Sequence, residues 1–333
     1  MKNQAELEIE KRLSGVLPGT FHLEKNQFQS KIPPFFASSL TAQSEGKGSV
    51  KAFDIFPGIE LSFHEYLADS VSFAHDAKSH VMEINYCKNG RIGWKMKDGL
   101  TAYLGSGDLS IHTIDCCAES KIDMPLGYYE GISLSVDLQV LNRHIPDLLK
   151  EAAFDPDVFL EKFCKDKRIA ALPSDNHIIN IFTFFPEIPE NLLIPYWKLK
   201  VQELLLYLMA IPAMPRKESS QYKVEQVAVI QKIHEQLTHQ LNRRFTIDEL
   251  SRQYLMNTSS LKAVFKTVYG LPIALYMKEF RMKEAAKLLR ETPDSIAAIS
   301  RYLGYENQSK FTAAFKDIFQ ILPSEYRRQY DIK

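Results

Sequence analysis

Three side chains that could bind a metal ion lie close together in the sequence, at His75, His80 and Glu83. Histidines and carboxylates are common metal ligands. The spacing here is His-x4-His-x2-Glu, rather than the close His-x-His arrangement that strand-based sites favour. Side chains alternate between the faces of a strand, so His80 and Glu83 would point to opposite faces. Only His112 follows at a candidate offset. We therefore expect no metal site, no catalytic residue and no cofactor.

The four cysteines, Cys87, Cys116, Cys117 and Cys164, have no paired spacing. Adjacent cysteines rarely form a disulfide with each other, and no Cys-x-x-Cys motif accompanies them. We expect reduced thiols that serve in packing, and a redox or thiol–metal sensor is the functional alternative. The sequence also lacks a nucleophile motif, a phosphate-binding glycine loop and a dinucleotide fingerprint. We therefore expect that the protein is not an enzyme.

A third set of side chains could line a pocket. Their stretch of sequence has the pattern of a small β-barrel, and the mouth of a barrel is a natural site for a small molecule. The aromatic and polar residues available to line it are Tyr86, Trp94, His112, Tyr128 and Tyr129. For each of them a place in the core is the alternative, because the sequence does not decide which strand face points inward.

Two segments near the C-terminus repeat one plan: TIDELSRQYLMNTSSLKAVFKTVYGLP and SIAAISRYLGYENQSKFTAAFKDIFQILP. Ile247, Leu250, Leu261 and Phe265 of the first match Ile296, Ile299, Phe311 and Phe315 of the second. Small, polar or basic side chains occupy the other face of each second helix. The outward set of the first segment is Ser259, Ser260, Lys262, Ala263 and Lys266. The outward set of the second segment is Gln308, Ser309, Lys310, Ala313 and Lys316. Such faces suit a groove.

Local signals position these side chains on helices. Thr246 and Glu249 form a capping-box pattern that begins a short helix, and the polar run at 257–260 offers an N-cap to a second helix. Apolar residues then recur at helical spacing and predict a buried face: Leu261, Val264, Phe265 and Val268. In the second segment Gly304 lies at the turn, Asn307 is the expected cap, and Phe311, Phe315 and Ile318 are expected inward. Each segment is therefore a helix-turn-helix, whose second helix enters the major groove.

A helix is expected between the two units, because Pro272 suits a first helical turn and no glycine or proline follows before Pro293. About 18 residues would span roughly 27 Å. That length can hold two recognition helices about one turn of DNA apart, roughly 34 Å.

On these residues the sequence resembles the C-terminal domain of the AraC/XylS family of transcription regulators, from about Val224 to Arg328, including the closing segment at 322–327. The sequence departs from the family pattern at Leu255 and Gln320, where glycine is usual. The resemblance implies an all-α, seven-helix DNA-binding domain. In the resulting assignment, Gln308 pairs with adenine, Ala263 or Ala313 meets a thymine methyl, and Lys266, Lys316, Arg327 and Arg328 contact phosphates.

The preceding half alternates with period two at residues 59–67, 81–87, 91–96 and 132–136, with turns at 88–90, 97–99 and 105–108. Short strands separated by such turns predict a barrel or sandwich. The phrase at 103–109, leading into Ile111 and His112, resembles the cupin-like effector domains attached to many AraC-type regulators. Helices are expected at 5–13, 138–151, 156–164, 176–185 and 195–211, and residues 20–50 are expected to be irregular. In AraC-type proteins a helix at the place of 195–211 often makes the dimer contact. The alternative is that its apolar stripe packs on its own barrel.

The predicted fold class is α+β. A cupin-like β-barrel (about 50–137) and a helical dimerisation region (138–211) form an effector-sensing domain, 1–211; residues 212–221 are a linker; and 222–333 bind DNA. The chain has 41 basic and 41 acidic residues. Basic residues are in excess from Lys223 onward and acidic ones before it, which suits a nucleic-acid module joined to a different one.

The resulting hypothesis is a cytoplasmic, homodimeric, sequence-specific transcription regulator controlled by an unknown small molecule in its barrel. Double-stranded DNA is the expected partner, RNA polymerase is a candidate partner, and no membrane contact is expected because no apolar run is long enough to span a bilayer. Sugars, other metabolites and an iron chelate are candidate effectors. The alternatives are a metal-dependent cupin enzyme tethered to a DNA-binding domain, and a regulator whose barrel binds a protein partner.

Overall fold

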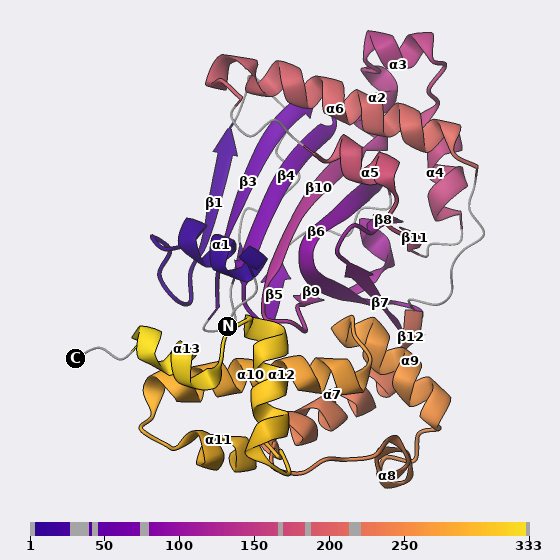
Figure 1. Ribbon diagram of the computed structural model, residues 1–333. Helices are drawn as coiled ribbons and strands as arrows, with labels where there is room; N and C mark the ends of the chain where they lie inside the picture. The colour runs from indigo at the N-terminus through magenta and orange to yellow at the C-terminus, as the bar shows by residue number, and fades with distance from the viewer. Residues whose placement is uncertain are drawn as a thin grey trace. The chain divides into compact units, whose positions relative to one another are not determined.

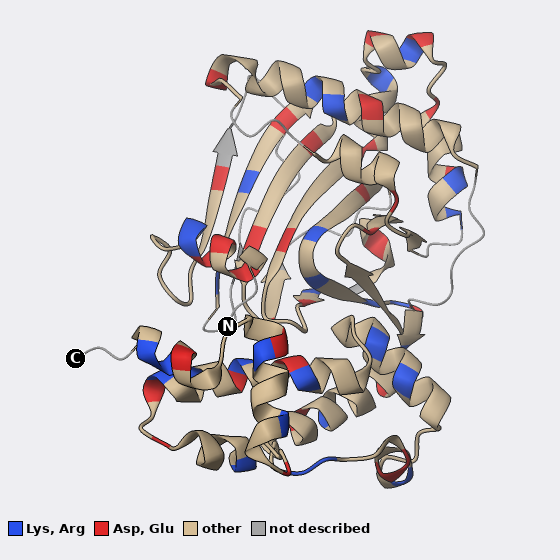
Figure 2. Ribbon diagram, in the orientation of Figure 1, with Lys and Arg blue, Asp and Glu red and all other residues tan. Residues whose placement is uncertain are grey.

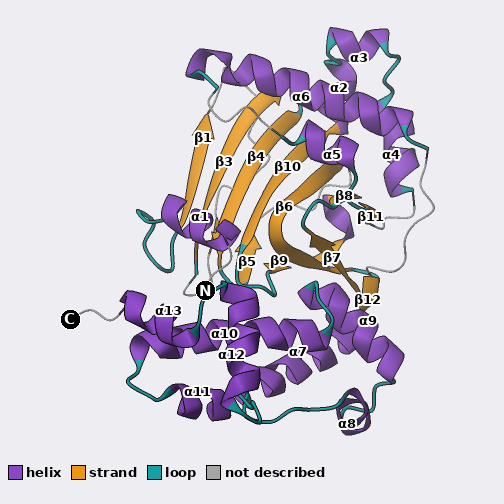
Figure 3. Cartoon of the chain, in the orientation of Figure 1, coloured by secondary structure: helices purple, strands orange, loops and turns teal. Residues whose placement is uncertain are grey.

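The computed structural model describes residues 4–26, 40–41, 46–73, 80–165, 169–183, 188–212 and 221–330. The chain divides into two compact units, one from Gln4 to Lys223 and one from Val224 onward. The first unit contains a large sheet with helices, and the second is helical (Figures 1 and 3). The chain is thus a mixed α and β protein.

The first unit is built on one sheet whose main path runs β1-β3-β4-β10-β6-β9-β5-β2. Strands β7 and β8 pair with β6, β11 pairs with β8, and β12 pairs with β7. The strands are β1 (Phe21–Asn26), β2 (Leu40–Thr41), β3 (Lys47–Phe56), β4 (Ile59–Leu67), β5 (Ser70–Phe73), β6 (Val81–Met96), β7 (Leu100–Gly105), β8 (Leu109–Thr113), β9 (Cys117–Asp123), β10 (Tyr129–Asp137), β11 (Ala170–Leu172) and β12 (Gln221–Lys223).

Strand β6 corrects the predicted turn at residues 88–90. It is continuous over 16 residues and curves from β10 toward β7 and β9 (Figure 1). Gly90 lies in the middle with φ +84°, and a Cβ there would come within 2.3 Å of the Tyr128 carbonyl oxygen. The glycine therefore bends one strand around the half-barrel. Three further strands, β1, β2 and the start of β3, lie in the stretch predicted to be irregular.

Helices pack on the outer face of the sheet. They are α2 (Leu138–Arg143), α3 (Asp147–Glu151), α4 (Pro156–Cys164), α5 (Asn176–Ile181) and α6 (Glu190–Ala210). The single helix predicted at 138–151 is wrong, because Pro146 separates α2 from α3 and a proline removes an intrahelical hydrogen bond. Helix α6 begins before its predicted start at Pro195, which lies inside it.

The apolar stripe of α6 is buried against its own sheet. Trp197, Val201 and Leu205 belong to one core with Leu61, Ile84 and other outer-face residues of the strands. The Trp197 ring lies 5.1 Å from the ring of Phe63. The stripe therefore packs inside the first unit, which is the alternative that the sequence analysis set against a dimer contact.

Helix α1 (Gln4–Arg12), close to its predicted range, is fixed on the outer face near β4. Ile9 and Leu13 are buried in a small core with Tyr128. Arg12 forms ion pairs with Glu65 and, at 3.2 Å, with Glu130.

The second unit consists of α7 (Val224–His239), α8 (Ile247–Gln253), α9 (Thr258–Tyr269), α10 (Ile273–Glu291), α11 (Ile296–Tyr302), α12 (Gln308–Phe319) and α13 (Pro323–Tyr330). Helix α10 contacts α7 and α9 as well as α11, α12 and α13. Residues 213–220 of the predicted linker lie outside the described residues, and β12 joins the sheet of the first unit. In the described part of the chain, no helix is long and apolar enough to cross a membrane.

Candidate nucleic-acid interface

The first helix-turn-helix begins with the predicted capping box. The Glu249 amide donates to Thr246 Oγ1 at 3.1 Å, and the Thr246 amide donates to Glu249 Oε2 at 2.7 Å. Asn257 caps α9 by accepting from the Ser260 amide at 2.8 Å. These short-range bonds fix where both helices begin.

Helix α9 has one buried and one exposed face. Leu261, Val264, Phe265 and Val268 are fully buried. The outward set of α9 is exposed except for Ser260, which is half-buried beside the cap. Figure 2 shows the lysine positions of α9 in blue.

Helix α12 repeats this arrangement. Asn307 accepts from the Lys310 amide at 2.9 Å, Phe311 and Phe315 are fully buried, and the whole outward set of α12 is exposed. The prediction for Ile318 is wrong, because it is 37% exposed. The neighbouring Phe319 packs instead, with its ring 4.4 Å from that of Phe315.

The turns of the two helix-turn-helix segments differ. Leu255 occupies the first turn with φ +51° and is 94% exposed, so its side chain is no obstacle there. Gly304 occupies the second turn with φ +73°, and a Cβ on it would come within 2.6 Å of the Leu241 carbonyl oxygen. Only the second turn therefore requires glycine for space.

The segment between α7 and α8 is hydrogen-bonded both to α10 and to the turn of the second helix-turn-helix. Arg281, buried on α10, donates to the carbonyl oxygens of Leu241 at 3.3 Å and Arg243 at 3.1 Å. Arg244 donates to the Gly304 carbonyl oxygen at 3.1 Å. Lys278 of α10 also pairs with Asp317 of α12 at 2.6 Å. These bonds set the position of one recognition helix relative to the other within the domain.

An aromatic cluster supports α9 from α7 and α10. The His234 ring stacks on Tyr269 at 4.2 Å, and its Nε2 lies 2.8 Å from the Tyr276 hydroxyl. Burial, with the nearby His239, lowers the pKa of His234 to about 4. The imidazole is therefore neutral at pH 7.

The predicted phosphate contacts have different surroundings. Lys266, Lys316 and Arg328 are exposed. Arg327 already donates to the carbonyl oxygens of Leu289 at 3.3 Å and Asp294 at 2.6 Å, so it attaches α13 to the end of α10. Phosphate would have to use its remaining N–H groups.

The five predicted pocket residues do not line one common site, because they lie in separate clusters. Trp94 and Tyr129 lie in a core between the two parts of the curved sheet, and the ring of His112 is 5.7 Å from Trp94. Tyr86 faces the other way and stacks on Phe182 at 4.2 Å. Tyr128 packs with α1.

The inner face of the sheet carries polar side chains, which we call the inner polar rows; sequence reasoning named Glu83 and His112 among them and missed the others. Cross-strand pairing aligns four strands, β4, β10, β6 and β8, in two rows. The first row is Ser62, Ser133, Asn85 and Ser110, and the second is Glu60, Ser135, Glu83 and His112. Polar residues at every second position of β4 and β6 are the sequence signal that could have identified them.

Of the described residues considered for metal binding, Glu83 and His112 lie together, whereas His80 lies against Asp137. His80 lies 3.8 Å from Asp137, whereas Glu83 lies 3.5 Å from His112, and His75 is outside the described residues. Among the residues described, no group of three histidines, cysteines or carboxylates is arranged to bind a metal. All four cysteines are free thiols.

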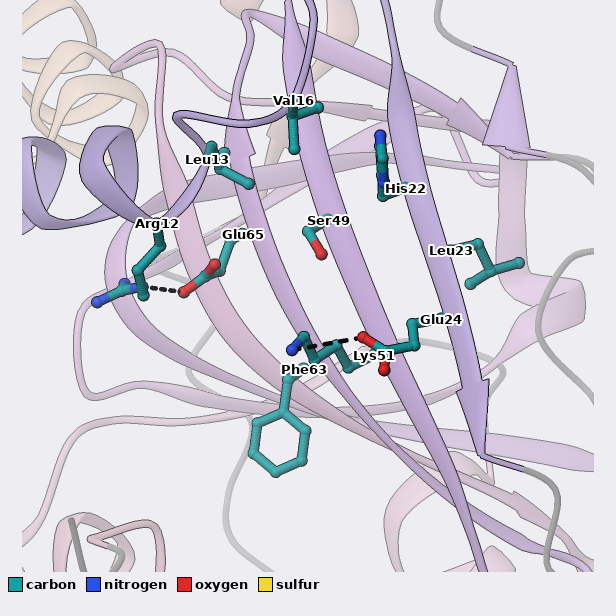
Figure 4. A pocket seen from close by; sticks show the side chains of 10 residues that line it. All are labelled: Arg12, Leu13, Val16, His22, Leu23, Glu24, Ser49, Lys51, Phe63 and Glu65. Atoms are coloured by element: carbon teal, nitrogen blue, oxygen red, sulfur yellow. Dashed lines mark hydrogen bonds and ion pairs between the residues drawn. The ribbon is translucent and has the colours of Figure 1, made fainter. Parts of the chain in front are cut away.

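A groove of about 750 Å³ lies on the outer face beside α1 (Figure 4). Its lining comprises Arg12, Leu13, Val16, His22, Leu23, Glu24, Ser49, Lys51, Phe63 and Glu65. Arg12 pairs with Glu65, and Lys51 with Glu24 at 3.4 Å. None of the five predicted pocket residues lines this groove.

Comparisons with known proteins identify the kind of domain that the helical unit forms. A family model described as a helix-turn-helix domain matches residues 250–329. The HTH-type transcriptional activator RhaR of Mannheimia succiniciproducens is 28% identical over 126 residues, which cover 38% of this chain and 45% of RhaR. The Msm operon regulatory protein of Streptococcus mutans is 25% identical over 240 residues, 68% of this chain and 81% of that protein. A putative AraC-like transcription regulator of Streptomyces lividans is 31% identical over 86 residues, 26% of this chain and 28% of that protein.

The fold and the matches define a DNA-binding domain with two helix-turn-helix units. The chain belongs to the AraC/XylS family of transcription regulators. It spans less than half the length of RhaR, so its effector, its partners and the activity of the whole protein are matters for proposal.

Proposed function

We propose that the protein is a sequence-specific transcription regulator that reads two successive major-groove segments of double-stranded DNA with α9 and α12. The matched exposure of the two helices supports this proposal most directly. In each helix the inward aromatic and aliphatic side chains, Leu261, Val264, Phe265 and Val268 of α9 and Phe311 and Phe315 of α12, are buried, while the outward set is exposed except for the half-buried Ser260. A helix with such a face fits a major groove.

Different side chains take different roles in this proposal. Within the outward sets, the serines, alanines, Lys262, Lys310 and Gln308 contact base edges, which carry sequence information. Lys266, Lys316, Arg327 and Arg328 contact phosphates, which fix position without specifying sequence. The ion pair of Lys310 with Glu306 is exposed and can exchange for a contact with DNA, because exposed pairs contribute little stability.

We propose further that the first unit is a cupin-like domain that binds a small effector and forms the homodimer. The buried stripe of α6 leaves its other face for a second copy, where Leu192 and Leu199 are 49% and 63% exposed. Effector binding would change how the dimer holds its DNA-binding domains. The effector must prefer one arrangement to have any influence. RNA polymerase remains a candidate partner, and the cytoplasm is the expected location.

Footprinting of purified full-length protein on genomic DNA tests the DNA function. We expect protection of two major-groove segments on one side of the duplex, about 34 Å apart. Binding should weaken steeply as salt rises, because released counterions contribute to affinity. Absence of affinity for any duplex at low salt would overturn the proposal.

A further inference from the structure

Cross-strand pairing arranges the floor of the groove beside α1 as two short rows of side chains from β1, β3 and β4. The first row is His22, Ser49 and Glu65, and the second is Glu24, Lys51 and Phe63. Figure 4 shows Ser49 in the middle of the groove, between Glu65 and His22. Successive side chains of a strand point to opposite faces. This floor therefore lies on the face of the sheet opposite to the inner polar rows.

The first row offers polar groups that the described part of the chain does not use. Ser49 is half-buried and His22 is exposed, and neither side chain forms a hydrogen bond or an ion pair with another described residue. Arg12 donates to Oε1 of Glu65, and a carboxylate has further lone pairs on its second oxygen. A ligand can therefore donate to Glu65 and share a hydrogen bond with Ser49.

The charges of the groove are balanced between the two signs. Lys51 pairs with Glu24 at 3.4 Å, and both side chains are 59% exposed. An exposed pair contributes little to stability, so each partner can exchange the other for a ligand group. A purely anionic ligand would also meet the carboxylates of Glu24 and Glu65, and a purely cationic one would meet Lys51 and Arg12. Like charges disfavour each other, so a ligand with both signs fits best.

The spacing of Lys51 and Glu65 suits two charges that lie close together in one molecule. The two residues are diagonal neighbours on the antiparallel strands β3 and β4, which places their Cβ atoms about 7–8 Å apart. The ammonium and the carboxylate of an α-amino acid are joined through a single carbon. One such molecule between the two side chains can donate to Glu65 and accept from Lys51 at the same time.

The groove also has an apolar side. Val16 and Phe63 are half-buried and line it together with the buried Leu13. Lys47 Nζ donates to the Leu13 carbonyl oxygen at 2.8 Å, which holds this segment on the sheet. The volume of about 750 Å³ lies within the range of small-molecule sites, about 300–1,000 Å³. The groove therefore has room for an apolar side chain beside the charged groups.

We propose that the groove beside α1 binds a zwitterionic α-amino acid with an apolar side chain. Glu65 and Ser49 accept from its ammonium, Lys51 donates to its carboxylate, and Val16 and Phe63 contact its side chain. This inference adds a site on the outer face of the sheet to the proposed function, and it does not depend on what the inner face binds.

Calorimetric titration of the full-length protein tests the class of ligand. The probes are valine, leucine, methionine and phenylalanine, each with two matched analogues: the amine that lacks the carboxylate and the acid that lacks the ammonium. We expect at least one amino acid to bind about tenfold or more tightly than both of its analogues, because each analogue loses a charge-assisted hydrogen bond. An acid or an amine that binds as tightly as its amino acid would overturn the proposal, as would no binding of any amino acid at millimolar concentrations.

Lys51→Gln tests the position of the carboxylate. Affinity for the amino acid should fall about ten- to a hundredfold, whereas affinity for the matched amine should not fall, so the preference for the amino acid disappears. The melting temperature should stay at the parent value, because the lost ion pair is exposed. Lys121→Gln is the control, since Lys121 also forms an ion pair, with Asp123 at 3.7 Å, but does not line the groove. An undiminished preference in Lys51→Gln, or an equal loss in the control, would overturn the assignment.

Ser49→Ala tests the position of the ammonium. It removes a hydroxyl that has no partner among the described residues, so the fold should be undisturbed. Affinity for the amino acid and for the matched amine should both fall about three- to tenfold, while weak binding of the matched acid stays the same. Unchanged affinity for the amino acid would contradict the contact with Ser49.

Discussion

Arg281, in the middle of α10, donates from Nε to the carbonyl oxygen of Leu241 at 3.3 Å, and the same carbonyl oxygen lies against Gly304 of the second turn. One backbone segment therefore contacts both the connecting helix and the second helix-turn-helix. Burial lowers the pKa of Arg281, but the group stays charged at neutral pH because its ordinary value is far higher.

Replacing Arg281 should destabilise the DNA-binding domain. Arg281→Leu removes two charge-assisted hydrogen bonds and leaves the carbonyl oxygens of Leu241 and Arg243 without them, at a cost of about 2–4 kcal/mol. Urea unfolding measures the change. Lys283→Ala, exposed on the same helix, is the control and should cost less than about 0.5 kcal/mol. Equal losses in both variants would contradict the role given to Arg281.

The two turns should respond oppositely to substitution. Gly304→Ala places a Cβ 2.6 Å from a backbone oxygen at φ +73° and should cost about 2–3 kcal/mol, from left-handed strain and the displaced segment. Leu255→Gly relieves the same strain at an exposed site and should stabilise by up to about 1 kcal/mol, offset in part by glycine entropy. Thermal melts of both variants check the signs, and a stabilising Gly304→Ala would refute the packing argument.

Lys162 closes the C-terminal end of α6, because its ammonium donates to the carbonyl oxygens of Leu208 at 2.9 Å and Met209 at 2.8 Å. Cations near a helix C-terminus are stabilising. Lys162→Met should therefore lower the stability of the first unit by about 1–3 kcal/mol, measured by chemical unfolding. Lys165→Met, which breaks an exposed pair with Glu161, should change it little.

Protonation of His234 should destabilise the second unit in acid. Its folded pKa is about 4, whereas an unfolded histidine has a pKa near 6.5. The unfolded chain thus binds the proton more readily, so stability is fully present above about pH 6.5 and falls as pH decreases toward 4. In His234→Phe, which retains stacking on Tyr269, the loss of stability between pH 7 and pH 5 should be smaller than in the parent. Identical pH profiles would exclude this histidine as the cause.

The proposed DNA contacts should separate by salt dependence. Lys266→Ala removes a phosphate contact, so it should weaken binding to all sequences alike and reduce the salt slope by about one unit. Gln308→Ala should instead relax discrimination at one base position, by about 1–3 kcal/mol. Anisotropy titrations over a set of single-base site variants measure both. Lys287→Ala, exposed on α10, is the control, and a sequence-selective loss in Lys266→Ala would contradict its assigned role.

The sequence by itself determined the helices that carry the DNA-reading faces. Thr246 with Glu249, Asn257 and Asn307 act within a few residues of themselves, and the apolar spacing from Leu261 to Val268 repeats along one helix. Local hydrogen bonds and helical periodicity leave these elements little choice, so they were predictable without knowledge of distant residues.

Only the tertiary structure decided which faces and groups remain available. The predicted turn at residues 88–90 became part of a continuous strand because β10 pairs with residues 81–90, and β7 and β9 pair with the residues that follow. Ile318 is exposed because Phe319 packs on Phe315, and Arg327 is engaged by carbonyl groups of another helix. The inner polar rows likewise depend on four strands that are distant in sequence. Each outcome depends on contacts between elements, whose free energy the residues of one element do not specify.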